Sequence, residues 1–122
     1  MDRLIAFVAT ARPDESRSFY RDVVGLTFVE ESPFAIVFLS GETMLRIQKV
    51  AEVPEPADTA LGWEVDDITA RMGELAAKGI VFERFDGFDQ DESGVWNAPG
   101  GTKVAWFRDP DGNRLSLTQF AG

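Results

Sequence analysis

The spacing of apolar residues divides the first fifty residues into five short elements. Four apolar runs have the length of strands and are bounded by turn-forming residues: 4–10, 26–30, 34–39 and 44–50. A helix is predicted between the first two runs, because Phe19, Tyr20 and Val23 recur at helical spacing. Pro13 suits the first turn of that helix and Gly25 suits its end. The pattern predicts the order β-α-β-β-β.

The second half repeats this order. Residues 60–65 and 80–85 are apolar runs of strand length. A helix is predicted between them, because Asp66 or Asp67 is a natural N-cap and Gly79 suits the end. The repeat is clearest where Gly-Leu-Thr-Phe-Val-Glu after the first helix matches Gly-Ile-Val-Phe-Glu-Arg after the second.

Two longer features complete the second half. Residues 86–101 lack periodicity, and a loop of this length is typical of a lid or binding loop, with Trp96 as its amphipathic cap. Residues 106–119 predict a hairpin, because Asp-Pro-Asp-Gly supplies turn chemistry and leucines then alternate with polar residues. We interpret Asp109 and Asp111 as turn formers rather than catalytic groups.

The linker between the halves carries two prolines and three acidic residues and has no periodicity. A chain of 122 residues suits one domain, or two small halves that share a core. We therefore expect a single α+β domain built from two βαβββ modules and a linker: residues 1–50, 59–122 and 51–58.

The amino-acid composition limits the kinds of molecule that the protein can bind. Twelve basic and twenty-one acidic residues give a formal net charge of −9, which repels a nucleic-acid backbone and attracts a cationic ligand. No apolar run approaches the roughly 20 residues that span a bilayer. The chain has no cysteine for a disulfide framework. These features predict a cytoplasmic protein with neither nucleic acid nor membrane as a partner.

The absence of histidine restricts the chemistry further. Without histidine or cysteine there is no imidazole base, no Ser-His pair and no thiolate nucleophile. Any metal site would need carboxylate, amide or backbone oxygens, which suit hard ions better than zinc or iron.

Three motifs in the expected order resemble the vicinal-oxygen-chelate superfamily, which includes glyoxalases, extradiol dioxygenases and bleomycin-resistance proteins. They are Ser-Arg-Ser-Phe-Tyr-Arg-Asp-Val-Val-Gly-Leu in the first helix, Trp-Glu-Val-Asp-Asp-Ile before the second, and Asp-Pro-Asp-Gly-Asn before the last strand. The resemblance extends from Leu4 to Gln119. It implies two curved sheets paired around a central cup, formed within one chain or between two by exchange of halves. It also implies a homodimer.

The resemblance indicates where a metal would bind. Metalloenzymes of the superfamily carry histidine, glutamine or a carboxylate at one position on each of four strands. Aligned by the helix-ending glycines and the hairpins, those positions here are Ile5, Arg46, Ala60 and Ser116. Isoleucine and alanine cannot ligate a metal, and arginine is a fixed cation that repels one. We therefore expect no bound metal and no other cofactor.

Alternation along the strands predicts which side chains line the cup. Leu115 and Leu117 should pack under a helix, which turns Ser116 and Thr118 toward the cup. The predicted ligand-binding set combines aromatic, charged and hydrogen-bonding side chains: Phe7, Phe38, Arg46, Gln48, Glu64, Trp96, Trp106, Ser116 and Thr118. A salt bridge between Arg46 and Glu64 is an alternative use of those two residues.

The leading functional hypothesis is metal-independent binding of a planar or cationic small molecule, as in the drug-sequestering resistance proteins of the superfamily. In an enzymatic version, of the lyase or isomerase type, Arg46 would stabilise an oxyanion and Glu64 would act as the base. No nucleophile is visible, which favours binding. The alternatives are a divalent-metal-dependent lyase or dioxygenase with unconventional ligands such as Glu64 and Gln48, and a scaffold with a collapsed cup that binds another protein.

Overall fold

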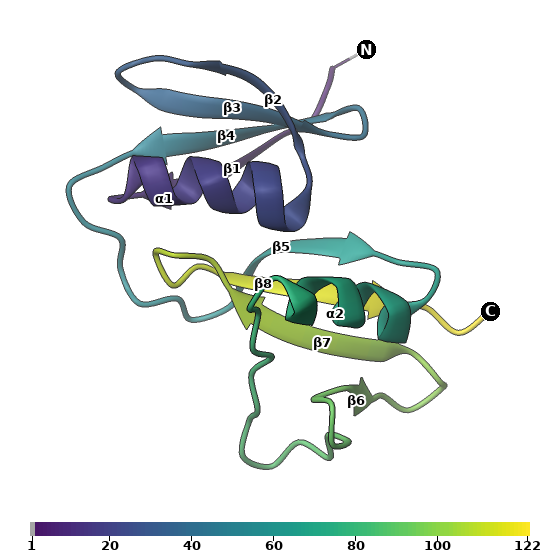
Figure 1. The fold of residues 1–122 in the computed structure, drawn as a ribbon. Coiled ribbons are helices and arrows are strands. Elements are labelled where there is room, and N and C mark those ends of the chain that lie inside the picture. The colour runs from purple at the N-terminus through teal and green to yellow at the C-terminus, as the bar shows by residue number, and fades with distance from the viewer. Residues whose placement is uncertain (1) are drawn as a thin grey trace. The chain divides into compact units, whose positions relative to one another are not determined.

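Each half of the chain folds into a four-stranded mixed sheet with a helix against one face (Figure 1). The computed structural model describes residues 2–122. It forms two compact units, one of residues up to Ala57 with Asp109–Asn113, the other of Asp58–Arg108 with Arg114–Gly122. The α+β class predicted from the sequence is confirmed. Within the described residues, no helix is both long and apolar enough to cross a membrane.

The first unit follows the predicted element order. Its elements are β1 (Ile5–Thr10), α1 (Pro13–Ser18), the π-helix η1 (Phe19–Val24), β2 (Thr27–Glu31), β3 (Ala35–Ser40) and β4 (Thr43–Lys49). The strands lie in the order β1-β4-β3-β2, with β1 parallel to β4 and the other pairs antiparallel. The helical segment ends at Gly25, whose φ of 89° is the left-handed conformation that glycine adopts most readily.

The second unit repeats the arrangement, except that its edge strand comes from the long loop rather than from the segment directly after the helix. Its elements are β5 (Thr59–Glu64), α2 (Ile68–Ala77), β6 (Trp96–Asn97), β7 (Lys103–Arg108) and β8 (Arg114–Gln119). The strands lie in the order β5-β8-β7-β6, with β5 parallel to β8. Of the two predicted N-cap candidates, Asp66 and Asp67, the N-cap is Asp67, whose Oδ1 accepts a hydrogen bond from the Ala70 N–H at 3.1 Å.

The strand predicted at residues 80–85 is wrong. That segment has no strand structure, although its Glu83 N–H donates to the Trp106 carbonyl of β7 at 2.7 Å. The start of β7, at Lys103 and Val104, pairs instead with β6, which comes from the predicted loop. The physical reason lies in the Gln90 side chain. Its Oε1 accepts from the Phe85 N–H at 2.8 Å, and its Nε2 donates to the Glu83 carbonyl at 2.9 Å. The side chain thus satisfies backbone groups that a strand would have paired.

The turn between β7 and β8 belongs to the first unit, where a buried carboxylate organises it. Asp109 Oδ1 accepts from the backbone N–H groups of Asp111 and Asn113, both at 2.9 Å. Asp109 Oδ2 accepts from the Tyr20 hydroxyl at 2.7 Å. Asn113 Nδ2 donates to the Ala9 carbonyl of β1 at 2.9 Å. The predicted turn formers therefore also fasten the turn to β1 and to the helical segment.

We predict that Tyr20→Phe destabilises the protein by about 1.5–3 kcal/mol near neutral pH, the range for a hydrogen bond to a charged group. The ring contacts of Tyr20 with Phe19 and Phe38, at centroid distances of 5.1 and 6.2 Å, remain possible for phenylalanine. The loss would therefore be that of the bond to Asp109. Urea unfolding measures it, with the double variant Tyr20→Phe/Asp109→Asn to isolate the coupling.

The cost of Tyr20→Phe should also depend on pH. Burial raises the pKa of Asp109 in the folded state above its ordinary value of 3.8, so its contribution to stability falls as the pH rises from 3.8 through that raised pKa. The Tyr20 hydroxyl favours the charged carboxylate. Its removal should cost most above this window and less below it, where the carboxyl is neutral. An equal cost at about pH 7 and about pH 3 would contradict this account.

Candidate functional site

The first sheet leaves one face uncovered by its helix, and three predicted site residues lie on that face. The register places Phe7 beside Arg46, and Gln48 lies two residues further along β4. Phe7 is 51% exposed, Arg46 is half-buried and Gln48 is exposed. Arg46 therefore presents a guanidinium next to an accessible aromatic ring, an arrangement that can contact a flat or anionic group.

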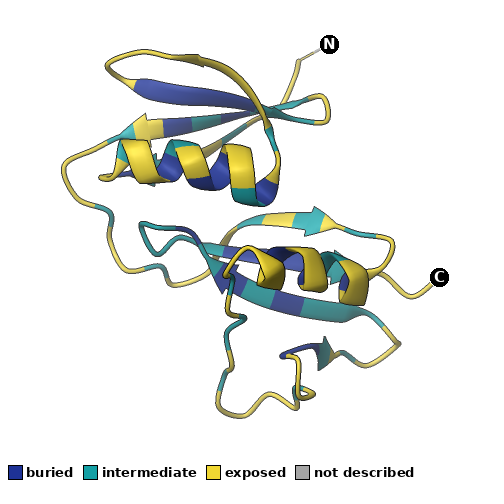
Figure 2. Cartoon of the chain, viewed as in Figure 1, coloured by how far each residue is buried: buried dark blue, intermediate teal, exposed yellow. Residues whose placement is uncertain are grey.

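Phe38 does not lie on that face, so its predicted place in the cup is wrong. It is fully buried on the helix-covered side, with ring centroids 6.2 Å from Tyr20 and 5.7 Å from Phe28. Figure 2 shows β3 dark blue over most of its length. Because β3 is apolar on both faces, the alternation of apolar and polar residues does not show which side chains face the helix. The orientation of Phe38 is seen only from the register, which pairs it with Leu45 on β4.

The second sheet also has an uncovered face, and it carries the predicted polar residues. The register pairs Ser116 with Gly62 on β5 and with Trp106 on β7, and it pairs Thr118 with Glu64. Ser116 is 7% exposed, Thr118 is half-buried and Glu64 is exposed. The predicted orientation of these side chains agrees with the register.

Ser116 depends on a glycine beside it. A Cβ at Gly62 would lie 2.7 Å from Ser116 Oγ, so a larger residue there would displace the hydroxyl. Within the described part of the second unit this hydroxyl has no hydrogen-bond partner. A nearly buried hydroxyl on an uncovered face is a polar group that a ligand can satisfy.

Four aromatic side chains gather on the same face around Trp106. Trp106 has ring centroids 5.2 Å from Phe85, 5.7 Å from Phe88 and 6.2 Å from Trp96. We call these four residues the aromatic patch. Trp96 and Trp106 were predicted. Phe85 was missed because it was assigned to a strand, and Phe88 because a single aromatic in a loop gives no periodic signal.

Charged groups border the aromatic patch at one end. The guanidinium of Arg114 lies 5.0 Å from the Phe85 ring centroid, as in a cation–π contact. Glu83 accepts from Arg114 Nε at 3.1 Å and from Arg108 Nε at 2.9 Å. One carboxylate therefore partly neutralises both Arg114 and Arg108.

The loop that carries Trp96 is held by its own hydrogen bonds. Asp91 Oδ1 accepts from the Ser93 hydroxyl at 2.6 Å and from the Val95 N–H at 3.0 Å. The Ser93 hydroxyl and the backbone N–H groups lower the pKa of Asp91, which keeps it charged. Arg84 Nη2 donates to the Asp91 carbonyl at 2.7 Å. Asp91 thus builds the loop, and Trp96 is placed by its pairing with Val104.

The positions that the superfamily resemblance associates with metal binding offer poor ligands. Ile5 and Arg46 lie on the uncovered face of the first sheet, Ala60 lies at an irregularity of β5, and Ser116 lies on β8. Among residues 2–122, no group of three histidine, cysteine, aspartate or glutamate side chains is placed to hold a metal ion.

Comparison with solved structures gives close matches in fold. A lactoylglutathione lyase from Agrobacterium tumefaciens has a TM-score of 0.74 at 20% identity, covering 97% of this chain and 92% of that one. A putative glyoxalase family protein from Bacillus anthracis has a TM-score of 0.76 at 17% identity, covering 99% and 96%. TnmS3, an antibiotic-binding protein from Streptomyces sp. CB03234, has a TM-score of 0.74 at 23% identity, covering 99% and 97%.

Comparison with curated protein sequences gave no significant match. The family model of the Glyoxalase/Bleomycin resistance protein/Dioxygenase superfamily matches residues 3–117, nearly the whole chain. The fold of both units agrees with that match. The chain belongs to the Glyoxalase/Bleomycin resistance protein/Dioxygenase superfamily.

Proposed function

We propose that this protein is a metal-independent small-molecule-binding member of its superfamily, and that it holds a planar or cationic ligand against the uncovered face of the second sheet. The observation that carries the proposal is the aromatic patch beside the unpartnered hydroxyl of Ser116. Aromatic rings supply stacking area, and one hydroxyl fixes orientation, which is the usual composition of a small-molecule site.

The charged residues around this face favour one orientation of a bound cationic ligand along β8. Arg114 lies at one end of β8, and Thr118, paired with Glu64, lies about 13 Å further along the strand. A cationic group would be repelled by the arginine end and attracted toward Glu64. The net charge of −9 favours a cation over the whole surface. A flat ring system on Trp96 and Trp106 with its cationic group toward Glu64 satisfies both requirements.

Binding is favoured over catalysis by the state of the candidate catalytic groups. Glu64 is exposed, so it lacks the desolvated surroundings that tune a carboxylate into a general base. Neither histidine nor cysteine is available. The fold shared with an antibiotic-binding protein of Streptomyces supports the same conclusion. The homodimer expected from the family resemblance, and a role of Phe7, Arg46 and Gln48 in holding the ligand, stay predictions.

We predict that proflavine, a planar cation, quenches tryptophan fluorescence saturably and that Trp106→Leu weakens its binding by roughly two- to tenfold, the range expected for one lost stacking contact. Trp63→Phe is the matched control, because Trp63 lies on β5 with its side chain on the opposite face from Gly62 and Glu64. An equal loss in both variants would place the dye elsewhere.

We predict that Arg46→Ala weakens a planar anion such as 9-anthracenecarboxylate by about 1.5–3 kcal/mol and leaves proflavine binding unchanged, because only the anion accepts charge-assisted hydrogen bonds from the guanidinium. The control is Arg21→Ala, an exposed arginine whose ion pair is with its neighbour Asp22. Isothermal titration calorimetry measures the affinity of each variant for the anion and for proflavine. An unchanged affinity for the anion would exclude Arg46 as a ligand-binding residue.

The metal content of the purified protein distinguishes the proposed function from the metal-dependent alternative. We expect elemental analysis of protein prepared without chelator to find no stoichiometric divalent ion, because the positions associated with metal binding hold Ile5, Arg46, Ala60 and Ser116. One tightly held ion per chain, lost in a Glu64→Gln variant, would instead support a lyase or dioxygenase with unconventional ligands.

A further inference from the structure

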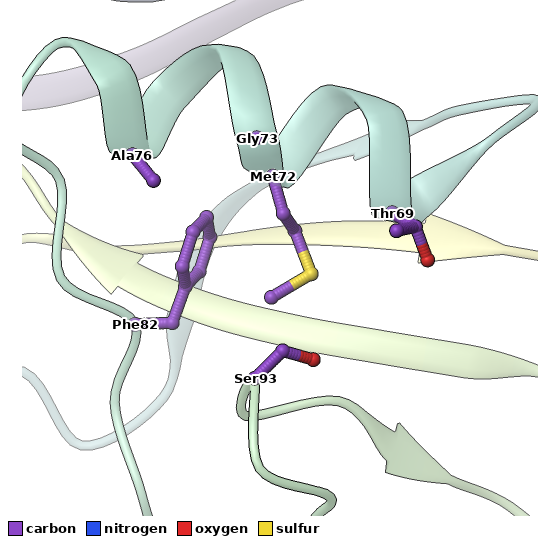
Figure 3. Close-up of a pocket in the computed structure, with 6 residues that line it drawn as sticks. All are labelled: Thr69, Met72, Gly73, Ala76, Phe82 and Ser93. Atoms are coloured by element: carbon purple, nitrogen blue, oxygen red, sulfur yellow. The ribbon is translucent and has the colours of Figure 1, made fainter.

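A cavity lies on the helix side of the second sheet, away from the aromatic patch. Its volume is about 320 Å³, and it opens between α2 and the loop after it. Figure 3 shows helix residues directed toward Phe82 and Ser93. Phe82 contacts Phe107, on the helix side of β7, at a centroid distance of 5.7 Å. The cavity is lined by Thr69, Met72, Gly73, Ala76, Phe82 and Ser93.

The space exists for two structural reasons. Residues 80–85 do not form the predicted strand, so Phe82 lies on a loop rather than in the sheet. Gly73, inside α2, has no atom within 4 Å of where its Cβ would lie. Glycine costs helix stability relative to alanine, and no close contact here requires it. The missing side chain leaves the cavity open on its helix side.

The lining chemistry selects for one kind of molecule. Met72 is 5% exposed, and its flexible thioether and the Phe82 ring form an apolar wall that suits an aromatic ring (Figure 3). The Ser93 hydroxyl donates its proton to Asp91 Oδ1 at 2.6 Å, which leaves only lone pairs for a ligand. A ligand group that meets Ser93 Oγ must therefore be a donor. The charged Asp91 and Glu92 beside Ser93 disfavour an anion.

We propose that this cavity is a second binding site, which takes a small neutral aromatic molecule with one hydrogen-bond donor, such as a phenol. The ring lies between Met72 and Phe82, and the hydroxyl donates to Ser93 Oγ. The site is separate from the proposed ligand face, because its residues lie on the helix side and it shares no residue with the aromatic patch.

The test is a titration of the full chain with phenol, followed by amide chemical shifts. We expect saturable shifts at Met72, Gly73, Phe82 and Ser93. Anisole, which has the same ring and no donor, should bind roughly three- to tenfold more weakly, as one hydrogen bond predicts. Ser93→Ala should reduce the affinity for phenol to that for anisole. The loop should keep its conformation in this variant, because Asp91 still accepts hydrogen bonds from three backbone N–H groups.

A filling variant provides the second arm. Gly73→Leu should weaken phenol binding at least about tenfold, because the leucine side chain enters the cavity. The control is Ala77→Leu, which should leave phenol binding unchanged because Ala77 is exposed on the same helix and does not line the cavity. A dispersed amide spectrum shows that each variant is folded, and Gly73→Ala replaces the leucine variant if that one does not fold. No saturable shift, shifts confined to Trp96 and Trp106, or equal binding of phenol and anisole would overturn the proposal.

Discussion

A buried carboxylate fixes the turn between β7 and β8. Asp109 is 6% exposed, and its oxygens accept hydrogen bonds from the Tyr20 hydroxyl, from two backbone N–H groups of the turn and from the side-chain amide of Asn113. A carboxylate without such donors would be too costly to bury, so the donors define where it can lie. Because β7 enters this turn and β8 leaves it, the turn also fixes how those two strands pair.

That pairing determines the composition of the uncovered face. With the observed register, Trp106 lies opposite Ser116, and Phe107 lies opposite Leu115 on the helix side. A slip of β8 by one residue would turn Ser116 under the helix and bring Leu117 to the uncovered face. The aromatic patch and its polar neighbour therefore share a face because of a turn whose carboxylate is bound within the other unit.

The sequence predicted the elements best where a strand has two unlike faces. In β8 and β4 the alternation of apolar and polar residues gave the orientation of Ser116 and Arg46 correctly. Prediction failed where periodicity carried no information. Phe38 lies in a strand that is apolar on both faces. Residues 80–85 have a strand-like composition, but the Gln90 side chain satisfies the Phe85 N–H and the Glu83 carbonyl, and hydrophobic periodicity does not reveal such side-chain bonds.

The uncovered face of the second unit has the physical character of a binding surface. Ser116 has Gly62 and Trp106 as its paired neighbours, and a hydroxyl without a base beside it is a hydrogen-bonding group rather than a nucleophile. Arg108 and Arg114 already share the carboxylate of Glu83. Stacking contributes alike to the binding of a ground state and of a transition state. Such uniform binding lowers a dissociation constant without accelerating a reaction, which is the physical basis of the binding role proposed for this face.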